Sequence, residues 1–261
     1  MHVYAGTDAL LILGTTSEAS ALTDDEKDEV VSFIIKQNNK RLKIIVGVIT
    51  NNTLEGYKKA QKYESMGADY LLVSPPYYNK TNSSGLLKHF EYIAKGVSIP
   101  ILIYNVPSRI GMNIKMEEFI KLKAIKNIVG VKESNKDINQ IIELANICDD
   151  NFNLYCGNDD LSYLFLSLGA KGLINVYGNI DPKSIKNLLH LYLENELLAR
   201  KYFFEHYNLF KLLFIETNPI PIKALMNCIG MDVGGFRLPL DTMSENNLNL
   251  LKNEYLNTGY K

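Results

Sequence analysis

The stretch Ile128-Val129-Gly130-Val131-Lys132-Glu133-Ser134 decides the fold prediction. Its first four residues form a short run without polar alternation, which is typical of a strand covered on both faces, and the run ends in a lysine. We predict a strand over Ile128–Lys132, and six further runs have the same character. They are Ala9–Leu13, Leu42–Val48, Tyr70–Ser74, Ile101–Asn105, Asn153–Cys156 and Gly172–Val176.

Longer segments with the apolar period of an amphipathic helix separate these runs. They are Asp24–Gln37, Thr53–Ser65, Gly85–Lys95, Lys115–Leu122, Asp137–Ile147 and Leu161–Leu168. Thr23 and Thr53 suit helix N-caps, and Gly67, Gly96 and Gly169 suit helix ends. Regular alternation of strand and helix predicts a parallel α/β architecture. A doubly wound sheet is the alternative, but no phosphate-binding fingerprint is present and motif residues follow many strands, so we expect a TIM (β/α)8 barrel.

The two ends of the chain depart from a complete barrel. Seven strands are predicted where a closed barrel has eight. Residues Met1–Tyr4, followed by Ala5-Gly6, have the pattern of the last turn of a helix and its C-cap. We therefore expect a barrel that lacks its first strand and most of its first helix.

After Val176 the pattern is helical to the end of the chain. The predicted helices are Asp181–Leu193, Glu194–Phe214, Pro221–Ile229 and Ser244–Tyr255. We predict a (β/α) barrel over residues 1–194 and a helical C-terminal extension over residues 195–261.

The composition excludes several classes of protein. A chain of 261 residues fits one barrel of about 250 residues. With a formal net charge of -1 and no basic tract longer than Lys40-Arg41-Leu42-Lys43, a nucleic-acid partner is not expected. No apolar run approaches the roughly 18 residues of a membrane span, and no cleavable leader is recognisable. We therefore expect a cytoplasmic protein with no membrane partner.

The cysteines and histidines form no metal-binding or nucleophile pattern. Cys148, Cys156 and Cys228 include no CxxC pair, which favours free, buried thiols over a disulfide or a reactive cysteine. The four histidines include no HxH or HExxH pair. Because nucleotide-binding motifs are absent as well, we expect no metal ion and no cofactor.

Residues at the carboxyl ends of barrel strands face the active site, and Lys132 is predicted to lie there. Its amine follows Ile-Val-Gly-Val, and in apolar surroundings desolvation favours the neutral, nucleophilic form. The alternative is a strand-end lysine that points to solvent, and the lysine alone does not exclude it.

Other strand ends carry polar groups, each with a structural alternative. Tyr104 suits a proton relay, although strand-end tyrosines are more often packing residues. Thr15 and Thr16 could equally be a turn or an N-cap pair. Arg109 suits a substrate carboxylate or is a surface charge. Their joint placement on one rim favours an active site.

Together these motifs resemble the dihydrodipicolinate synthase/N-acetylneuraminate lyase superfamily of pyruvate-dependent aldolases, over the whole chain. The motifs that carry the resemblance are Gly14-Thr15-Thr16-Ser17-Glu18, Pro75-Pro76-Tyr77-Tyr78-Asn79-Lys80, Tyr104-Asn105-Val106-Pro107-Ser108-Arg109-Ile110-Gly111, Gly130-Val131-Lys132-Glu133-Ser134 and Glu216-Thr217-Asn218-Pro219-Ile220-Pro221-Ile222-Lys223. Arg109 points to the dihydrodipicolinate synthase branch, because sialate lyases typically lack an arginine at this place.

The resemblance implies a class I aldolase that condenses pyruvate with L-aspartate 4-semialdehyde to 4-hydroxy-tetrahydrodipicolinate, in lysine and diaminopimelate biosynthesis. It implies that Lys132 forms an imine with pyruvate. It also implies that Tyr104 moves protons, linked to Thr15 and to Tyr78 of a neighbouring subunit. The family is usually a homotetramer, so a homotetramer or homodimer is expected.

The resemblance also assigns substrate-binding groups. Thr16 and the backbone at Ile174 are expected to hold the pyruvate carboxylate, and Arg109 the carboxylate of the aldehyde substrate. One departure is Ser17, which replaces a family glycine and is expected to change the turn, since glycine often serves positive φ. Residues 176–179 match the family loosely, and about 30 residues are expected to be lacking in front of Met1 if one βα unit is lost.

Two alternatives stay open. One is another aldolase or lyase of the superfamily that acts on a sugar acid or hydroxy-oxo acid. The other is an inactive, shortened subunit that associates with complete copies. Within the leading interpretation, inhibition by lysine is expected to be weak, because Asp24 and Lys27 stand where lysine-sensitive members carry histidines.

Overall fold

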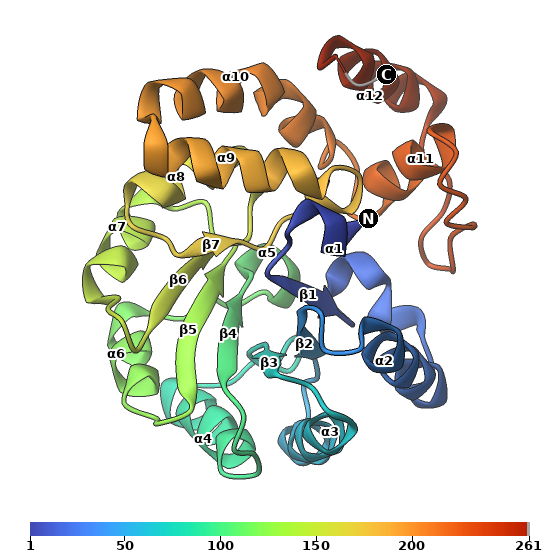
Figure 1. The fold of residues 1–261 in the computed structure, drawn as a ribbon. Helices are drawn as coiled ribbons and strands as arrows, with labels where there is room; N and C mark the ends of the chain where they lie inside the picture. Colours follow the sequence, from blue (N-terminus) through green and yellow to red (C-terminus); the bar gives the residue numbers. More distant parts are fainter. Residues whose placement is uncertain (260–261) are drawn as a thin grey trace.

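The computed structural model describes residues 1–259, and a curved parallel sheet lies at its centre (Figure 1). Seven strands pair in chain order, and every pair is parallel. They are β1 (Ala9–Ile12), β2 (Lys43–Val48), β3 (Tyr70–Val73), β4 (Ile101–Asn105), β5 (Ile128–Glu133), β6 (Asn153–Cys156) and β7 (Gly172–Leu173). This confirms the predicted parallel α/β architecture of a barrel with seven strands. Among residues 1–259 the sheet has no eighth strand, and β1 and β7 are its two ends.

A helix follows each of the first six strands and lies outside the sheet (Figure 1). These helices are α2 (Asp24–Asn38), α3 (Thr53–Met66), α4 (Ser83–Ala94), α6 (Met116–Lys123), α7 (Ile138–Ile147) and α8 (Ser162–Ser167), and the short α5 (Pro107–Ile110) precedes α6. Thr23 is the N-cap of α2, as predicted, and it forms a capping box with Glu26. The prediction that Thr53 is the N-cap of α3 is wrong. Asn52 is the N-cap, because its Oδ1 accepts hydrogen bonds from the backbone N–H groups of Leu54 and Glu55.

Strand β7 is shorter than predicted. The sequence pattern runs to Val176, but the strand ends at Leu173. Beyond it, the N–H groups of Val176 and Tyr177 donate to the carboxylate of Asp159 at 2.8–3.1 Å instead of to a neighbouring strand. A buried side-chain acceptor therefore turns the backbone out of the ladder, which an apolar pattern does not reveal.

Strand residues alternate between two apolar layers. Ile44 and Val46 belong to the layer between sheet and helices, whereas Ile45 belongs to the inner layer with Leu102 and Tyr104. Because both faces of the strands are covered, their sequences are nearly continuous in apolar residues. The inner layer forms the floor on which the site is built.

The glycines predicted near helix ends are explained by two different physical reasons. Gly67 and Gly169 adopt φ of 103° and 85°, which favours glycine. Gly96 lies one residue beyond Lys95, the C-cap of α4, and a Cβ there would lie 2.5 Å from the ring of Tyr57, so close packing explains this glycine. At the start of the chain, α1 (His2–Ala5) ends at Gly6 with φ 72°, which confirms the predicted helical turn and C-cap.

The last four helices build a separate apolar core beside the sheet. They are α9 (Pro182–Glu194), α10 (Glu196–Leu212), α11 (Ile220–Cys228) and α12 (Glu245–Asn257). In Figure 1, α9 and α10 lie side by side beyond β7, and α11 and α12 lie together past α1. The proposed boundary after residue 194 falls between α9 and α10, which share this core, and the division stays a prediction. Residues 260 and 261 of the proposed extension lie outside the described residues. None of the helices within residues 1–259 is long and apolar enough to span a membrane.

Candidate active site

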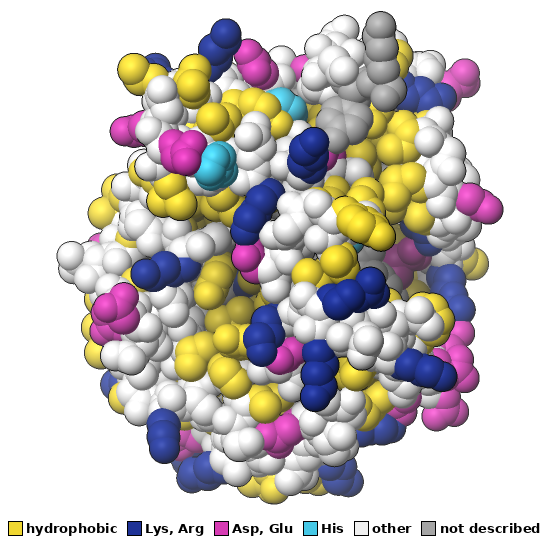
Figure 2. All heavy atoms as spheres, viewed as in Figure 1, with side chains coloured by type: hydrophobic (Ala, Val, Ile, Leu, Met, Phe, Trp, Pro, Cys, Tyr) yellow, Lys and Arg dark blue, Asp and Glu magenta, His cyan; other side chains and the backbone are white. Residues whose placement is uncertain are grey.

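A cavity of about 1120 Å³ opens at the carboxyl ends of the strands and extends between β1 and β7. Figure 2 shows a face of the molecule on which hydrophobic side chains line a hollow, with Lys and Arg side chains around it. Six of the seven predicted site residues line the cavity: Thr15, Thr16, Tyr104, Arg109, Lys132 and Ile174. Tyr78 is not among the lining residues; it is 90% exposed in the loop before α4.

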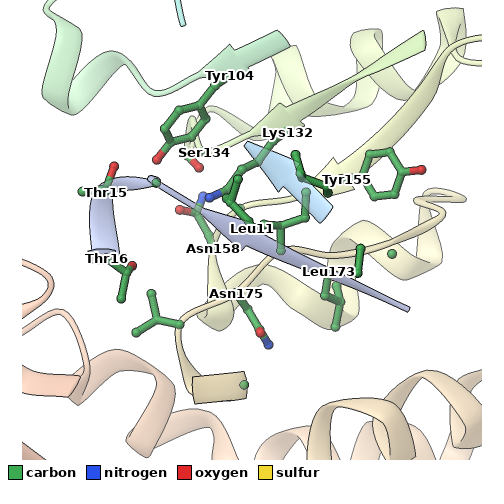
Figure 3. A pocket seen from close by; sticks show the side chains of 18 of the residues that line it. Leu11, Thr15, Thr16, Tyr104, Lys132, Ser134, Tyr155, Asn158, Leu173 and Asn175 are labelled. Atoms are coloured by element: carbon green, nitrogen blue, oxygen red, sulfur yellow. The ribbon is translucent and has the colours of Figure 1, made fainter. Parts of the chain in front are cut away.

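Lys132 and Tyr104 are partners in neighbouring strands. They are paired in the β4–β5 register, and the Lys132 Nζ lies 4.5 Å from the centroid of the Tyr104 ring. In Figure 3 the side chains of Thr15, Tyr104, Ser134, Lys132 and Asn158 surround one space, with the amine of Lys132 inside it. Gly157 makes room for this arrangement, since a Cβ there would lie 3.0 Å from Lys132 Cε and 2.1 Å from Ser134 Oγ. The strand-end lysine therefore points into the cavity and not to bulk solvent.

The surroundings of the Tyr104 phenol favour its ionised form more than water does. Its burial opposes the charged form, but the positive charge of Lys132, the hydroxyl of Thr15 and the charge of Arg109 together outweigh burial and lower the pKa of Tyr104. The hydroxyl of Ser134 contributes in the same direction. A phenol with a lowered pKa beside an amine suits proton transfer.

The turn that carries Thr15 and Thr16 is fixed by two left-handed residues. Leu13 has φ 53° and Glu18 has φ 54°, and between them residues Thr15–Ser17 form a single 3-10 turn. Ser17 is exposed and has no positive φ. The left-handed conformation falls on Glu18, so Ser17 is accommodated without strain, and a change of the turn relative to the family stays a prediction.

Arg109 and Thr16 are both bound by Asn218, which lies between α10 and α11. The Nδ2 of Asn218 donates to Thr16 Oγ1 at 3.0 Å. The Nη2 of Arg109 donates to the backbone carbonyl of Asn218 at 2.8 Å. The sequence motif around Asn218 contributed to the family resemblance, but it gave no sign that this residue reaches the barrel rim.

Ile174 lines the cavity, but its N–H donates to the carbonyl of Cys156 at 2.8 Å. That N–H is therefore already used within the fold. Of the expected carboxylate-binding groups, the hydroxyl of Thr16 is the one that supplies a side-chain hydrogen-bond donor for pyruvate.

Glu133 lies next to Lys132 in β5 but faces away from the cavity, where it is fully buried. Asn105 donates from Nδ2 to both carboxylate oxygens of Glu133 at 3.0 and 2.9 Å, and the N–H of Asn135 donates at 2.6 Å. Burial raises the pKa of Glu133 to about 7, although these hydrogen bonds oppose the rise. The network holds the ends of β4 and β5 behind Tyr104 and Lys132.

The remaining candidate groups are scattered. Cys156 is buried, Cys148 is intermediate and Cys228 is exposed, so the expectation of buried thiols holds for one of the three. Within residues 1–259, no group of three or more His, Cys, Asp and Glu side chains is placed to hold a metal ion.

Comparison with known proteins identifies the family. The model of the dihydrodipicolinate synthetase family matches residues 1–255. This chain belongs to that family. A 4-hydroxy-tetrahydrodipicolinate synthase of Clostridium novyi (strain NT) is 45% identical over 97% of this chain and 86% of its own. One from Thermoanaerobacter sp. (strain X514) is 46% identical, over 96% and 85%.

Solved structures of the family have the same fold. The dihydrodipicolinate synthase of Aquifex aeolicus superposes with a TM-score of 0.93 at 41% identity, covering 97% of this chain and 87% of its own. The 4-hydroxy-tetrahydrodipicolinate synthase of Methylacidiphilum fumariolicum SolV gives a TM-score of 0.96 at 35% identity, over 99% and 87%. The resemblance read from the sequence motifs is therefore confirmed for the family and for its barrel fold.

Within this family fold, several residues shape the site without having been predicted to do so. Asn218 contacts two candidate substrate-binding groups, Asp159 holds the backbone after β7, and Asn105 holds Glu133 behind the lysine. Asp159 had only a strand-end position to mark it, and Asn105 stands in a motif of the family resemblance that did not indicate its contact with Glu133.

Proposed function

We propose that this chain is a Schiff-base aldolase that condenses pyruvate with L-aspartate 4-semialdehyde to give 4-hydroxy-tetrahydrodipicolinate, a reaction of lysine and diaminopimelate biosynthesis. The observation that carries the proposal is the placement of Lys132 against Tyr104 in one cavity with Thr15, Thr16 and Arg109. The family, with relatives named for this activity at 45 and 46% identity, supports it.

The first half of the reaction uses Lys132. Its neutral amine attacks the ketone carbon of pyruvate, and water leaves as the imine forms. The protonated imine withdraws electrons, so a methyl proton is lost and an enamine results. Tyr104, with its lowered pKa and its contact to Thr15, accepts and returns the protons of these steps.

The second half joins the two substrates. The enamine carbon attacks the aldehyde carbon of aspartate semialdehyde, and a carbon–carbon bond forms while the aldehyde oxygen takes up a proton. The amino group of that substrate then attacks the imine carbon, closes the ring and displaces Lys132. Arg109 binds the carboxylate of the aldehyde substrate, and Thr16 donates to the carboxylate of pyruvate.

We propose a homotetramer or homodimer as the working form. Tyr78 is 90% exposed and does not line the cavity of its own chain, which leaves its phenol available to a neighbouring copy. A cytoplasmic location stays a prediction.

Borohydride trapping tests the proposal. The protein is incubated with pyruvate, reduced, digested and mapped by mass spectrometry, and we expect a stable adduct on Lys132. Lys132→Ala should remove the adduct. Lys123→Ala is the matched control, because Lys123 pairs with Asp149, does not line the cavity and should leave labelling intact. Folded protein without label at Lys132 would refute the aldolase assignment.

A further inference from the structure

Asn218 is the one residue that contacts both candidate carboxylate-binding side chains in the described hydrogen-bond network. Its side-chain amide donates to Thr16, 202 positions away along the chain, and its backbone carbonyl accepts from Arg109, 109 positions away. Asn218 is 6% exposed and lines the cavity. The segment between α10 and α11 thus forms part of the site, although it lies outside the sheet.

The direction of the hydrogen bond to Thr16 has a chemical consequence. A hydroxyl has one proton and can accept as well as donate. Because the Nδ2 of Asn218 occupies an acceptor position of Thr16 Oγ1, the hydroxyl proton is left to donate elsewhere. A carboxylate in the cavity is an acceptor for that proton, and a hydrogen bond to a charged group is stronger than one between neutral groups.

The amide oxygen of Asn218 supports a functional role for this orientation of the side chain. The Oδ1 of Asn218 is buried and has no hydrogen-bond partner among the described residues. Leaving a buried acceptor unpaired is unfavourable, and such groups in native proteins call for an explanation. An apolar residue of similar size would avoid this penalty but would not orient Thr16.

We propose that Asn218 is a positioning residue that makes Thr16 a hydrogen-bond donor toward the pyruvate carboxylate. The inference rests on the proposed function, because it takes pyruvate as the ligand of Thr16. Through its backbone carbonyl, the same residue also holds Arg109, which the proposed function assigns to the aldehyde substrate. The C-terminal helical region therefore determines the direction in which Thr16 donates its hydrogen bond and the orientation of Arg109.

The test reverses the hydrogen bond with almost no change of shape. In Asn218→Asp a carboxylate replaces the amide and accepts the proton of Thr16, so the hydroxyl no longer donates to the substrate. We expect the KM for pyruvate to rise by about 10- to 100-fold, the scale of one hydrogen bond to a charged group. In Asn218→Ala the hydroxyl stays free to turn toward the substrate, so we expect a smaller rise. Asn227→Asp is the matched control, because it makes the same change on α11, where its amide bonds Gly234 and not the site.

A double variant separates this effect from simple charge repulsion. If the carboxylate introduced by Asn218→Asp acts through Thr16, adding this change to Thr16→Val should raise the KM for pyruvate little further. Full additivity of the two changes would overturn the inference, as would equal KM values for Asn218→Asp and Asn218→Ala. Thermal melting of each variant identifies loss of fold.

The two proposals fail in different ways. Wild-type protein that forms no pyruvate adduct on Lys132 would overturn the proposed function, and this inference with it. A wild-type adduct together with an unchanged KM for pyruvate in Asn218→Asp would overturn the inference alone.

Discussion

Lys223 and Glu18 form an ion pair that joins α11 to the turn after β1, across 205 positions of the chain. The side chains retain 17% and 11% of their exposure, so the pair is mostly removed from solvent. Glu18 is the left-handed residue that ends the Thr15–Ser17 turn. The ion pair therefore ties the helical C-terminal region to the turn that carries two candidate site residues.

Removing the lysine should destabilise the protein. Lys223→Met leaves the largely covered carboxylate of Glu18 without its cation, and because the pair is only partly buried we expect a cost of about 1–3 kcal/mol, below that of a fully buried pair. We expect a clear decrease in the melting temperature. The double variant Glu18→Gln/Lys223→Met should recover part of this loss, since no uncompensated charge then remains. Calorimetry checks both results, and a double variant less stable than Lys223→Met would contradict this account.

Tyr104→Phe should distinguish the role of the aromatic ring from that of the phenolic hydroxyl. The ring under Lys132 is retained, whereas the proton relay is lost, so kcat should fall by about 10²- to 10⁴-fold. Borohydride trapping should still label Lys132 at long incubation times. Initial rates with both substrates measure the loss, and a kcat within about twofold of wild type would exclude Tyr104 as the relay.

The pH profile offers a second measure of this tyrosine. Because its pKa is lowered, the rate limb that belongs to Tyr104 should lie below the ordinary phenol value near 10. Thr15→Val removes a donor that stabilises the phenolate, so the limb should move to higher pH. Rates measured over a range of pH test this shift. If this limb of the pH–rate profile is unchanged in Thr15→Val, or is still present in Tyr104→Phe, it belongs to another group.

Arg109→Ala should affect the aldehyde substrate more than pyruvate. The guanidinium suits a carboxylate, and its Nη2 is already oriented by the carbonyl of Asn218. We expect the KM for aspartate semialdehyde to rise strongly, while the yield of the pyruvate adduct on Lys132 stays near that of wild type. Equal losses of adduct formation and of aldehyde binding would assign Arg109 to both substrates instead.

Glu133 should make stability depend on pH. Its pKa is about 7 in the folded protein against 4.5 for an ordinary glutamate, so the folded state binds an additional proton between these values. Its contribution to stability is therefore fully present below about pH 4.5 and is lost as pH rises through 7. The difference is worth about 3 kcal/mol.

Glu133→Gln does not titrate and provides the comparison for this effect. We expect the free energy of unfolding of the variant, relative to wild type, to increase as the pH rises from 4.5 to above 7. Urea unfolding of both proteins at several pH values measures it. A difference that is constant with pH would show that Glu133 does not carry the effect.

L-Lysine should inhibit weakly or not at all. The ammonium groups of Lys27 and Lys59 lie 3.1 and 3.0 Å from the single carboxylate oxygen Asp24 Oδ1, so this carboxylate is already paired with two cations. A cationic effector placed there is repelled by about 1 kcal/mol per nearby charge. Rates with added lysine test this, with Lys27→Ala as the comparison. Inhibition of the wild type at sub-millimolar lysine would contradict it.

Much of the fold could be predicted from the sequence, because its signals are local. Continuous apolar runs identified all seven strands, and β4 and β6 have the predicted bounds. Apolar period and Thr23 identified α2, and Gly6 identified the end of α1. Errors arose where a competing group took over the backbone, as Asn52 did at α3 and Asp159 did beyond β7.

By itself, the sequence determined that a lysine and a tyrosine lie near the carboxyl ends of two consecutive buried strands, and that the strands are parallel. Parallel pairing then places the two side chains together, since the carboxyl ends of neighbouring strands meet at one edge. Only the tertiary structure decided that Asn218 donates to Thr16 and accepts from Arg109. It also decided that Lys223 pairs with Glu18, and that Asn105 donates hydrogen bonds to Glu133. These contacts join segments up to 205 residues apart. They depend on the direction of individual hydrogen bonds, which no local pattern of apolar and polar residues specifies.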